Sequence, residues 1–136
     1  MIRLLMLAVL VLALAPFGVS PAGACGAKIE IQFFDSDGDI FIIQNQSEGS
    51  QKLTSLAIRL TGSAGRLIFD TEYGGLGASM SQPFAAVSGA DGDGVGFLGA
   101  APIDDGGEVV LLKFSDFLPG REFMFVIDVD DRLEHS

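Results

Sequence analysis

The sequence predicts an all-β protein, a single antiparallel β-sandwich of about seven or eight short strands, Ig-like or jelly-roll-like, behind a cleaved signal peptide. Three observations support this fold class. Apolar and polar residues alternate with period two in several short segments, as they do in strands with one buried face. Turn-forming residues separate these segments roughly every 8 to 12 residues, which is typical of sandwiches. No segment after residue 24 shows helical periodicity.

The first 24 residues have the pattern of a secretory signal peptide. Arg3 supplies positive charge, an apolar run extends from Leu4 to Leu14, and Ala22-Gly23-Ala24 is a small-residue cleavage site. No other run is long enough to cross a bilayer, so no membrane span is expected. We therefore assign residues 1–24 to a signal peptide and residues 25–136 to one β-sandwich domain. The expected location is secreted, periplasmic or at the cell surface of a bacterium.

Cys25 is the only cysteine, so no disulfide can form within the chain. It follows Ala24 directly, and the segment Ala22-Gly23-Ala24-Cys25 is similar to a bacterial lipobox, in which the cysteine becomes a lipidated N-terminus. Ala22 departs from the leucine that this pattern prefers. Two processed forms remain open, a soluble N-terminus and a lipid anchor at Cys25, and both require cleavage of the same bond.

Four strands are expected before residue 71, at residues 28–34, 40–43, 53–61 and 66–70. In the first, Ile29, Ile31 and Phe33 share one face and polar residues the other, which predicts a half-buried strand. The second is a continuous run of β-branched and aromatic residues. The third alternates again, and the fourth is a short apolar segment after a Gly-rich loop.

Four more strands are expected at residues 80–87, 95–98, 108–114 and 123–130. Pro83 confines the first of these to a sheet edge or a bulge. The second is the only regular segment expected in the Gly- and Asp-rich stretch 88–107. The last follows a Pro119-Gly120 turn. It is apolar on both faces, which predicts a position in the middle of a sheet covered on both sides.

The chain is strongly acidic, with 18 acidic and 8 basic residues and a formal net charge of −10. Removal of the leader takes away Arg3 but no acidic residue, so the mature chain is more negative still. Such a surface repels nucleic acid phosphates and anionic lipids, and it favours cations or basic partners. Abundant Ile, Leu, Val and Phe argue against disorder. We therefore expect no nucleic acid partner.

The turn after the first strand is a candidate Ca²⁺ site. Asp35, Asp37 and Asp39 alternate along it, and Ca²⁺ takes six to eight oxygen ligands of the kind that acidic loops supply. The segment is not an EF-hand, because Ile40 stands where that loop needs glycine. A solvated turn that binds no ion is the alternative, and both readings remain open.

A second candidate metal site lies at the end of the last strand. Asp128 and Asp130 point to the same face of that strand, and Asp131 adds a third carboxylate. These groups repel one another unless water solvates them or a cation is shared. We assign both acidic clusters as candidate ligands for Ca²⁺, with a solvated strand end as the alternative for the second.

Enzymatic residues are scarce, and the sequence predicts a protein that is not an enzyme. The only histidine, His135, lies in the C-terminal tail, where a catalytic base is hard to hold. Ser63 lacks the spacing of a nucleophile elbow. A carbohydrate-active module, binding or hydrolytic, is the alternative class. The chain has no tryptophan, and only Tyr73 beside Gly74-Gly75 could stack on a sugar.

Several segments stand in the order found in one group of small secreted bacterial proteins, namely Asp39–Ser47, Gly62–Asp70, Gln82–Phe84 and Pro119–Asp131. The chain resembles the aggregation factor core proteins, a group similar to the core protein of the sponge aggregation factor. The resemblance implies a secreted β-rich adhesion module whose association depends on Ca²⁺.

The chain departs from this group at one point. In the group a further strand follows the Asp-Asp motif, whereas here the chain ends shortly after Asp131. A missing strand would expose a sheet edge that can pair with another chain.

The sequence thus predicts a secreted acidic β-sandwich for cell-surface or matrix association. We expect its partner to be an extracellular protein, a polysaccharide or a second copy of the chain.

Overall fold

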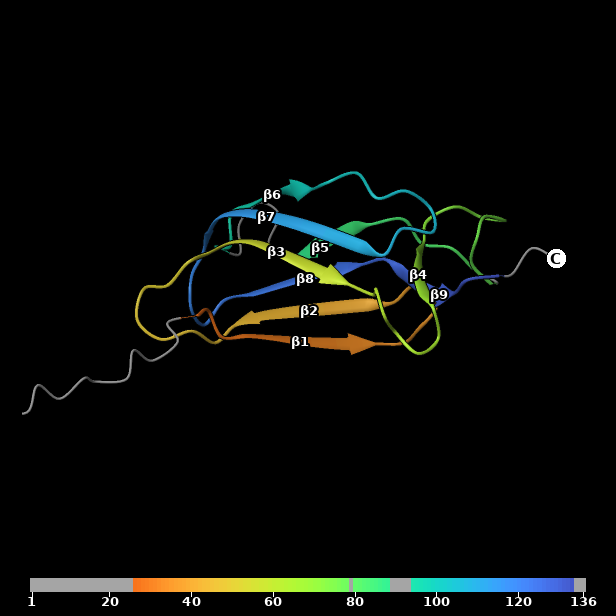
Figure 1. The fold of residues 1–136 in the computed structure, drawn as a ribbon. Helices are drawn as coiled ribbons and strands as arrows, with labels where there is room; N and C mark the ends of the chain where they lie inside the picture. The colour runs from red at the N-terminus through yellow and green to blue at the C-terminus, as the bar shows by residue number, and fades with distance from the viewer. Residues whose placement is uncertain (1–25, 79, 89–93, 134–136) are drawn as a thin grey trace, which may run out of the picture.

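The chain folds into short antiparallel strands that form three sheets (Figure 1). The computed structural model describes residues 26–78, 80–88 and 94–133, so the leader, Cys25 and His135 lie outside the described residues. Within those ranges the chain has no helix, and therefore none with the length and apolar character to cross a bilayer. The all-β prediction is confirmed. The strands are β1 (Ile29–Phe34), β2 (Ile40–Asn45), β3 (Leu53–Arg59), β4 (Leu67–Asp70), β5 (Ala85–Ser88), β6 (Phe97–Ala100), β7 (Val109–Phe117), β8 (Glu122–Val126) and β9 (Asp128–Asp131).

Two larger sheets face each other, and a small third sheet lies at one end (Figure 1). The four-stranded sheet has the order β1-β2-β8-β5, the three-stranded sheet β3-β7-β6, and the third consists of β4 and β9. As predicted, β8 lies in the middle of its sheet, and β5, which follows Pro83, lies at an edge. The outer face of β8 is only half-buried, so the expectation of cover on both sides holds for one face.

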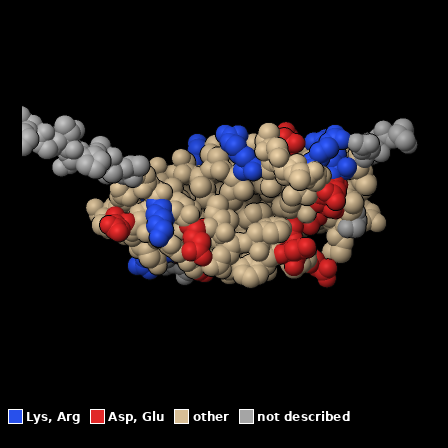
Figure 2. All heavy atoms as spheres, turned by 60° about the horizontal axis from the view of Figure 1, so that its bottom comes forward, with Lys and Arg blue, Asp and Glu red and all other residues tan. Residues whose placement is uncertain are grey.

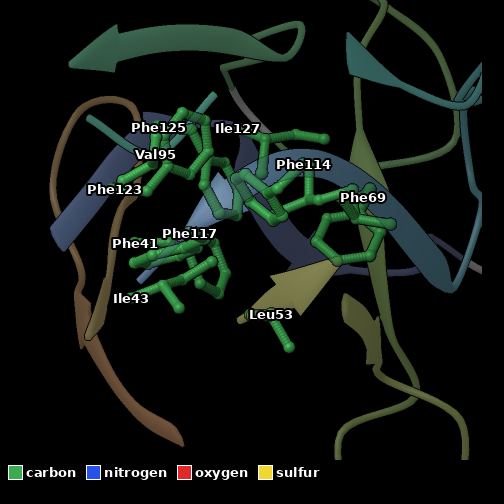
Figure 3. Packing of buried hydrophobic residues seen from close by; sticks show 12 residues of the cluster. Phe41, Ile43, Leu53, Phe69, Val95, Phe114, Phe117, Phe123, Phe125 and Ile127 are labelled. Carbon is green, nitrogen blue, oxygen red and sulfur yellow. The ribbon is translucent and has the colours of Figure 1, made fainter. Parts of the chain in front are cut away.

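Phenylalanine rings from both sheets fill the core (Figure 3). Phe41 of β2 stacks on Phe125 of β8, with ring centroids 4.9 Å apart. Phe123 of β8 meets Phe114 of β7 edge-on across the sandwich at 5.2 Å. Each fully buried ring contributes roughly 2–3 kcal/mol through the hydrophobic effect. Because side chains alternate between the two faces of a strand, Phe123 and Phe125 of β8 both point into this core.

The predicted last strand is divided into two strands that belong to different sheets. β8 ends at Val126, and β9 begins at Asp128. Between them the backbone N–H of Ile127 donates to the carbonyl of Asp39 (3.1 Å), while the N–H of Asp128 donates to the carbonyl of Gln82 (3.0 Å). This division brings the strand count of the described residues to nine. It carries the chain from the central sheet to the small end sheet, which places the acidic strand end.

The first strand differs from its prediction. Ile31 and Phe33, expected to be buried with Ile29, are 42% and 48% exposed. β1 is the outermost strand of the four-stranded sheet and pairs only with β2, while the sheet opposite has three strands. Among the three apolar residues on this face of β1, Ile29 packs against the core. Alternation identifies which side chains share a face, but cover on that face depends on the width of the opposing sheet.

Candidate functional site

An open pocket of about 450 Å³ lies where the turn between β1 and β2 meets β9. Two acidic segments that lie far apart in the sequence therefore share one site. On the face seen in Figure 2, acidic side chains gather toward the end of the molecule at which Figure 1 shows β4 and β9, with basic side chains beside them. The pocket is lined by Asp35, Ser36, Asp37, Asp39, Met80, Asp128, Val129 and Asp130.

Asp39 fixes the turn to β9. It is 2% exposed, and both its carboxylate oxygens accept hydrogen bonds from backbone amides. Oδ1 accepts from the N–H of Ser36 (3.0 Å), which closes the turn, and Oδ2 accepts from the N–H of Val129 (2.9 Å), 90 residues further along the chain. By contrast, Asp35 and Asp37 are exposed at the rim of the pocket. Amide donors therefore stabilise the charge of Asp39, while solvent reaches the other two carboxylates.

The end sheet brings three carboxylates together. In the antiparallel pairing of β4 with β9, Asp70 lies directly opposite Asp128, and Asp130 lies two residues further along the same face. One oxygen from each of Asp70, Asp128 and Asp130 lies within 4.8 Å of the other two. Like charges directly opposite one another destabilise a strand pair. This arrangement therefore costs stability unless a proton or a cation neutralises part of the charge.

Burial and repulsion disfavour the charged forms of two of these groups. Burial, followed by repulsion from Asp39 and Asp130, raises the pKa of Asp128 to about 6. Burial also raises the pKa of Asp70, and a side-chain hydrogen bond with Asp105 adds to that effect. In addition, Oδ1 of Asp70 is buried without a hydrogen-bond partner in the described structure. The charge at this end of the molecule is thus only partly stabilised by the protein's own donors.

Asp105 holds the loop that closes over Asp70. Its carboxylate accepts hydrogen bonds from the backbone N–H groups of Thr71 (3.0 Å), Glu72 (3.3 Å) and Leu76 (2.8 Å). Burial alone would raise the pKa of Asp105, but these amide donors lower it. The loop also needs glycine at position 77, because a Cβ there would lie 2.5 Å from Cγ of Asp70. Asp70 is therefore held by a closely fitted loop.

The structure brings together most of the carboxylates that the sequence singled out. Asp35, Asp37, Asp39, Asp128 and Asp130 line the pocket.

Asp131 is exposed and lies across from Leu67, on the face of β9 opposite to that of Asp128. It lines a neighbouring pocket instead.

Sequence reasoning missed Asp70 as a member of the site. Its position at the end of the predicted strand 66–70 indicated a carboxylate at a sheet edge. The register that places it opposite Asp128 could not be predicted from the sequence.

Tyr73 is the other residue singled out for binding. Its side chain is 89% exposed in the loop after β4, outside the acidic pocket.

Comparison with known proteins finds no family model, no curated protein and no solved structure that matches this chain.

Proposed function

We propose that this protein is a secreted, non-enzymatic β-sandwich that mediates association at the cell surface or in the extracellular matrix, and that this association depends on Ca²⁺. The observation that carries the proposal is the acidic pocket, in which carboxylates of the Asp35–Asp39 turn meet those of β9. Ca²⁺ prefers oxygen ligands of this kind and tolerates irregular geometry. The partner is an extracellular protein, a polysaccharide or a second copy of the chain.

Secretion rests on the leader at residues 1–24. Intact mass of the exported protein tests this part of the proposal, because it distinguishes a free thiol at Cys25 from a diacylglyceryl form. A product that still carries the apolar run from Leu4 to Leu14 contradicts both forms.

Bead aggregation tests the association directly. Beads coated with the processed protein are mixed in millimolar CaCl₂, in NaCl of the same ionic strength, and in CaCl₂ with excess chelator. The proposal predicts aggregation in the first condition only. Binding of the coated beads to a cell-surface polysaccharide fraction is measured in the same three buffers. Absence of both responses, or equal responses in CaCl₂ and NaCl, contradicts it.

Two observations favour a carbohydrate-active module as a second candidate. Tyr73 is an exposed aromatic ring that can stack on a sugar. The carboxyl of Asp128, with a pKa of about 6, lies close to Asp130 in an open pocket, as a general acid beside a second carboxylate does in glycosidases. A glycan array, with hydrolysis measured on the same sugars, separates the candidates. Sugar binding that is lost in Tyr73→Ala, or hydrolysis that is lost in Asp128→Asn, favours the second.

A further inference from the structure

We infer that Asp70, Asp128 and Asp130 form the Ca²⁺ site proper, with Asp70 as its most buried ligand. This inference rests on the cation dependence in the proposed function and deepens it by naming the ligands. The Asp35–Asp39 turn then forms the rim of the site and is not its centre.

The spacing of the three carboxylates suits one calcium ion. Ca²⁺ binds oxygens at 2.3–2.6 Å, so two oxygens on the same ion are at most about 4.6–5.2 Å apart. The chosen oxygens of Asp70, Asp128 and Asp130 all lie within 4.8 Å of one another. Three carboxylates can supply up to six oxygens when each binds through both of its own. The open pocket beside Asp128 and Asp130 leaves room for water to complete the coordination.

The burial of Asp70 is an independent reason to expect a cation here. Its side chain is 3% exposed, and its Oδ1 has no hydrogen-bond partner among the described residues. Burial of a carboxylate without such compensation is costly. The neighbouring buried carboxylate, Asp39, has an amide donor on each oxygen. The fold therefore supplies donors to one buried carboxylate and leaves an oxygen of the other available to a ligand.

The surroundings of Asp70 hold it in place for this role. Its backbone is fixed in the β4–β9 ladder opposite Asp128. The loop after β4 approaches so closely that Gly77 has no space for a Cβ, and Asp105 ties that loop down through three amides. A rigid carboxylate loses little conformational freedom on binding an ion, which favours affinity. An ion at this point would also join β4 to β9 and relieve the repulsion across the pair.

Titration calorimetry of Ca²⁺ into the processed protein, at constant ionic strength, tests the assignment with two variants. Asp70→Asn removes the charge and one of the two ligating oxygens of the buried side chain but keeps its size. Asp37→Asn tests the alternative, that the ion is bound by the turn, because Asp37 lines the same pocket from the exposed turn. We expect one Ca²⁺ per chain, an affinity within about threefold of the parent in Asp37→Asn, and at least about a thirtyfold loss in Asp70→Asn, because mutation of a residue that only supports a metal ligand already costs about 10–100-fold in metal affinity.

Folding of Asp70→Asn is checked by its melting temperature in chelator. This variant loses the repulsion between Asp70 and Asp128, so it should melt at least as high as the parent without Ca²⁺ and no longer respond to Ca²⁺. If it does not fold, Asp130→Asn, which changes a half-exposed ligand, replaces it with the same expected loss.

The outcomes separate this inference from the proposed function. If Asp70→Asn keeps its affinity and Asp37→Asn loses it, the ion is bound by the turn; the inference is overturned and the proposed function stands. If the parent binds no Ca²⁺, the inference is also overturned, whatever the beads do. If Asp70→Asn loses Ca²⁺ but beads coated with it still aggregate on addition of Ca²⁺, the inference stands and the cation dependence of association is contradicted.

Discussion

Asp39 and Asp70 are both buried aspartates at the same end of the molecule, and their surroundings assign them different roles. Asp39 receives a backbone amide on each oxygen and so joins the turn to β9. Asp70 faces Asp128 across a strand pair, and one of its oxygens has no hydrogen-bond partner in the part of the chain that the structure describes. We therefore treat Asp39 as a structural group and Asp70 as a ligand, although the sequence pattern pointed to the first and not to the second.

Asp39→Asn should destabilise the fold with or without Ca²⁺. The amide of asparagine cannot accept two hydrogen bonds at the same positions, so the N–H of Ser36 or of Val129 loses its acceptor. We expect a cost of about 1–3 kcal/mol, measured by urea unfolding in chelator. Asp37→Asn, in the same turn but exposed, should change stability by less than about 0.5 kcal/mol. Equal effects of the two substitutions would contradict the structural role of Asp39.

The stability of the metal-free protein should fall as pH rises from about 4 to about 6. The pKa of Asp128 is about 6 in the folded protein, against an ordinary value of 3.8. The folded state therefore keeps a proton in this window that the unfolded state has released, so its stabilising effect is present below pH 4 and is lost as pH passes 6. Burial is the largest cause of this raised pKa, and repulsion from the carboxylates of Asp39, Asp130, Asp70 and Asp35 adds to it.

We expect a loss of roughly 1–2 kcal/mol across this window, because water in the open pocket weakens the repulsion between the carboxylates. Urea unfolding in chelator at several pH values measures it. Asp128→Asn should make the profile less steep, while Asp70, whose pKa burial also raises, keeps part of the slope. A stability that rises through the same window in the parent but not in this variant would contradict the assignment to Asp128.

At the scale of secondary-structure elements, the pair β4–β9 and the loop after β4 build the site. The register of this pair sets Asp70 opposite Asp128, and the loop tied down by Asp105 covers Asp70. Gly77 lies where the loop passes closest to the Asp70 side chain. The site therefore depends on a loop that is itself fixed by a carboxylate.

Gly77→Ala should displace this loop and lower stability. The added Cβ would lie 2.5 Å from Cγ and 2.7 Å from Cβ of Asp70, so either the loop or the carboxylate has to move. We expect a cost of about 1–3 kcal/mol, as for other overpacked sites, together with weaker Ca²⁺ binding. Thermal melts in chelator and calorimetry measure the two effects. Gly26→Ala, which meets open space, is the control, and an unchanged melting temperature in Gly77→Ala would contradict the close fit.

Much of this arrangement could be predicted from the sequence, because strand alternation and turn residues are local properties. Phe123 and Phe125 stand two positions apart in the predicted strand 123–130, which puts them on one face, and they do point into the core. The division at Ile127 could not be predicted, because it arises from hydrogen bonds to Asp39 and Gln82, which are distant in the sequence.

The same reason applies to the site. Acidic clusters are visible in a sequence, but their proximity is set by strand pairing. Asp70 was not predicted as a site residue because it is the only acidic residue in the predicted strand 66–70. Its role follows only from the strand register that pairs it with Asp128.

For the molecule as a whole, the charge of −10 acts against the compact state through self-repulsion. Part of that repulsion is concentrated at one end, where the turn, β4 and β9 meet. The core of aromatic rings that the two larger sheets share stabilises the fold against this repulsion. A cation that binds at the acidic end would therefore stabilise the fold where repulsion is strongest, and it would link folding to the surrounding Ca²⁺ concentration.

The most direct test of this account is the melting temperature of the processed protein in millimolar CaCl₂, compared with NaCl of equal ionic strength. An ion that binds only the folded state stabilises it by about 2.7 kcal/mol at a hundredfold excess over Kd. For a domain of this size, we expect a rise of roughly ten degrees. NaCl should give a smaller rise through screening. Asp130→Asn should reduce the Ca²⁺ effect. Equal shifts in CaCl₂ and NaCl would contradict the account, because they would show that the carboxylates are solvated and share no ion.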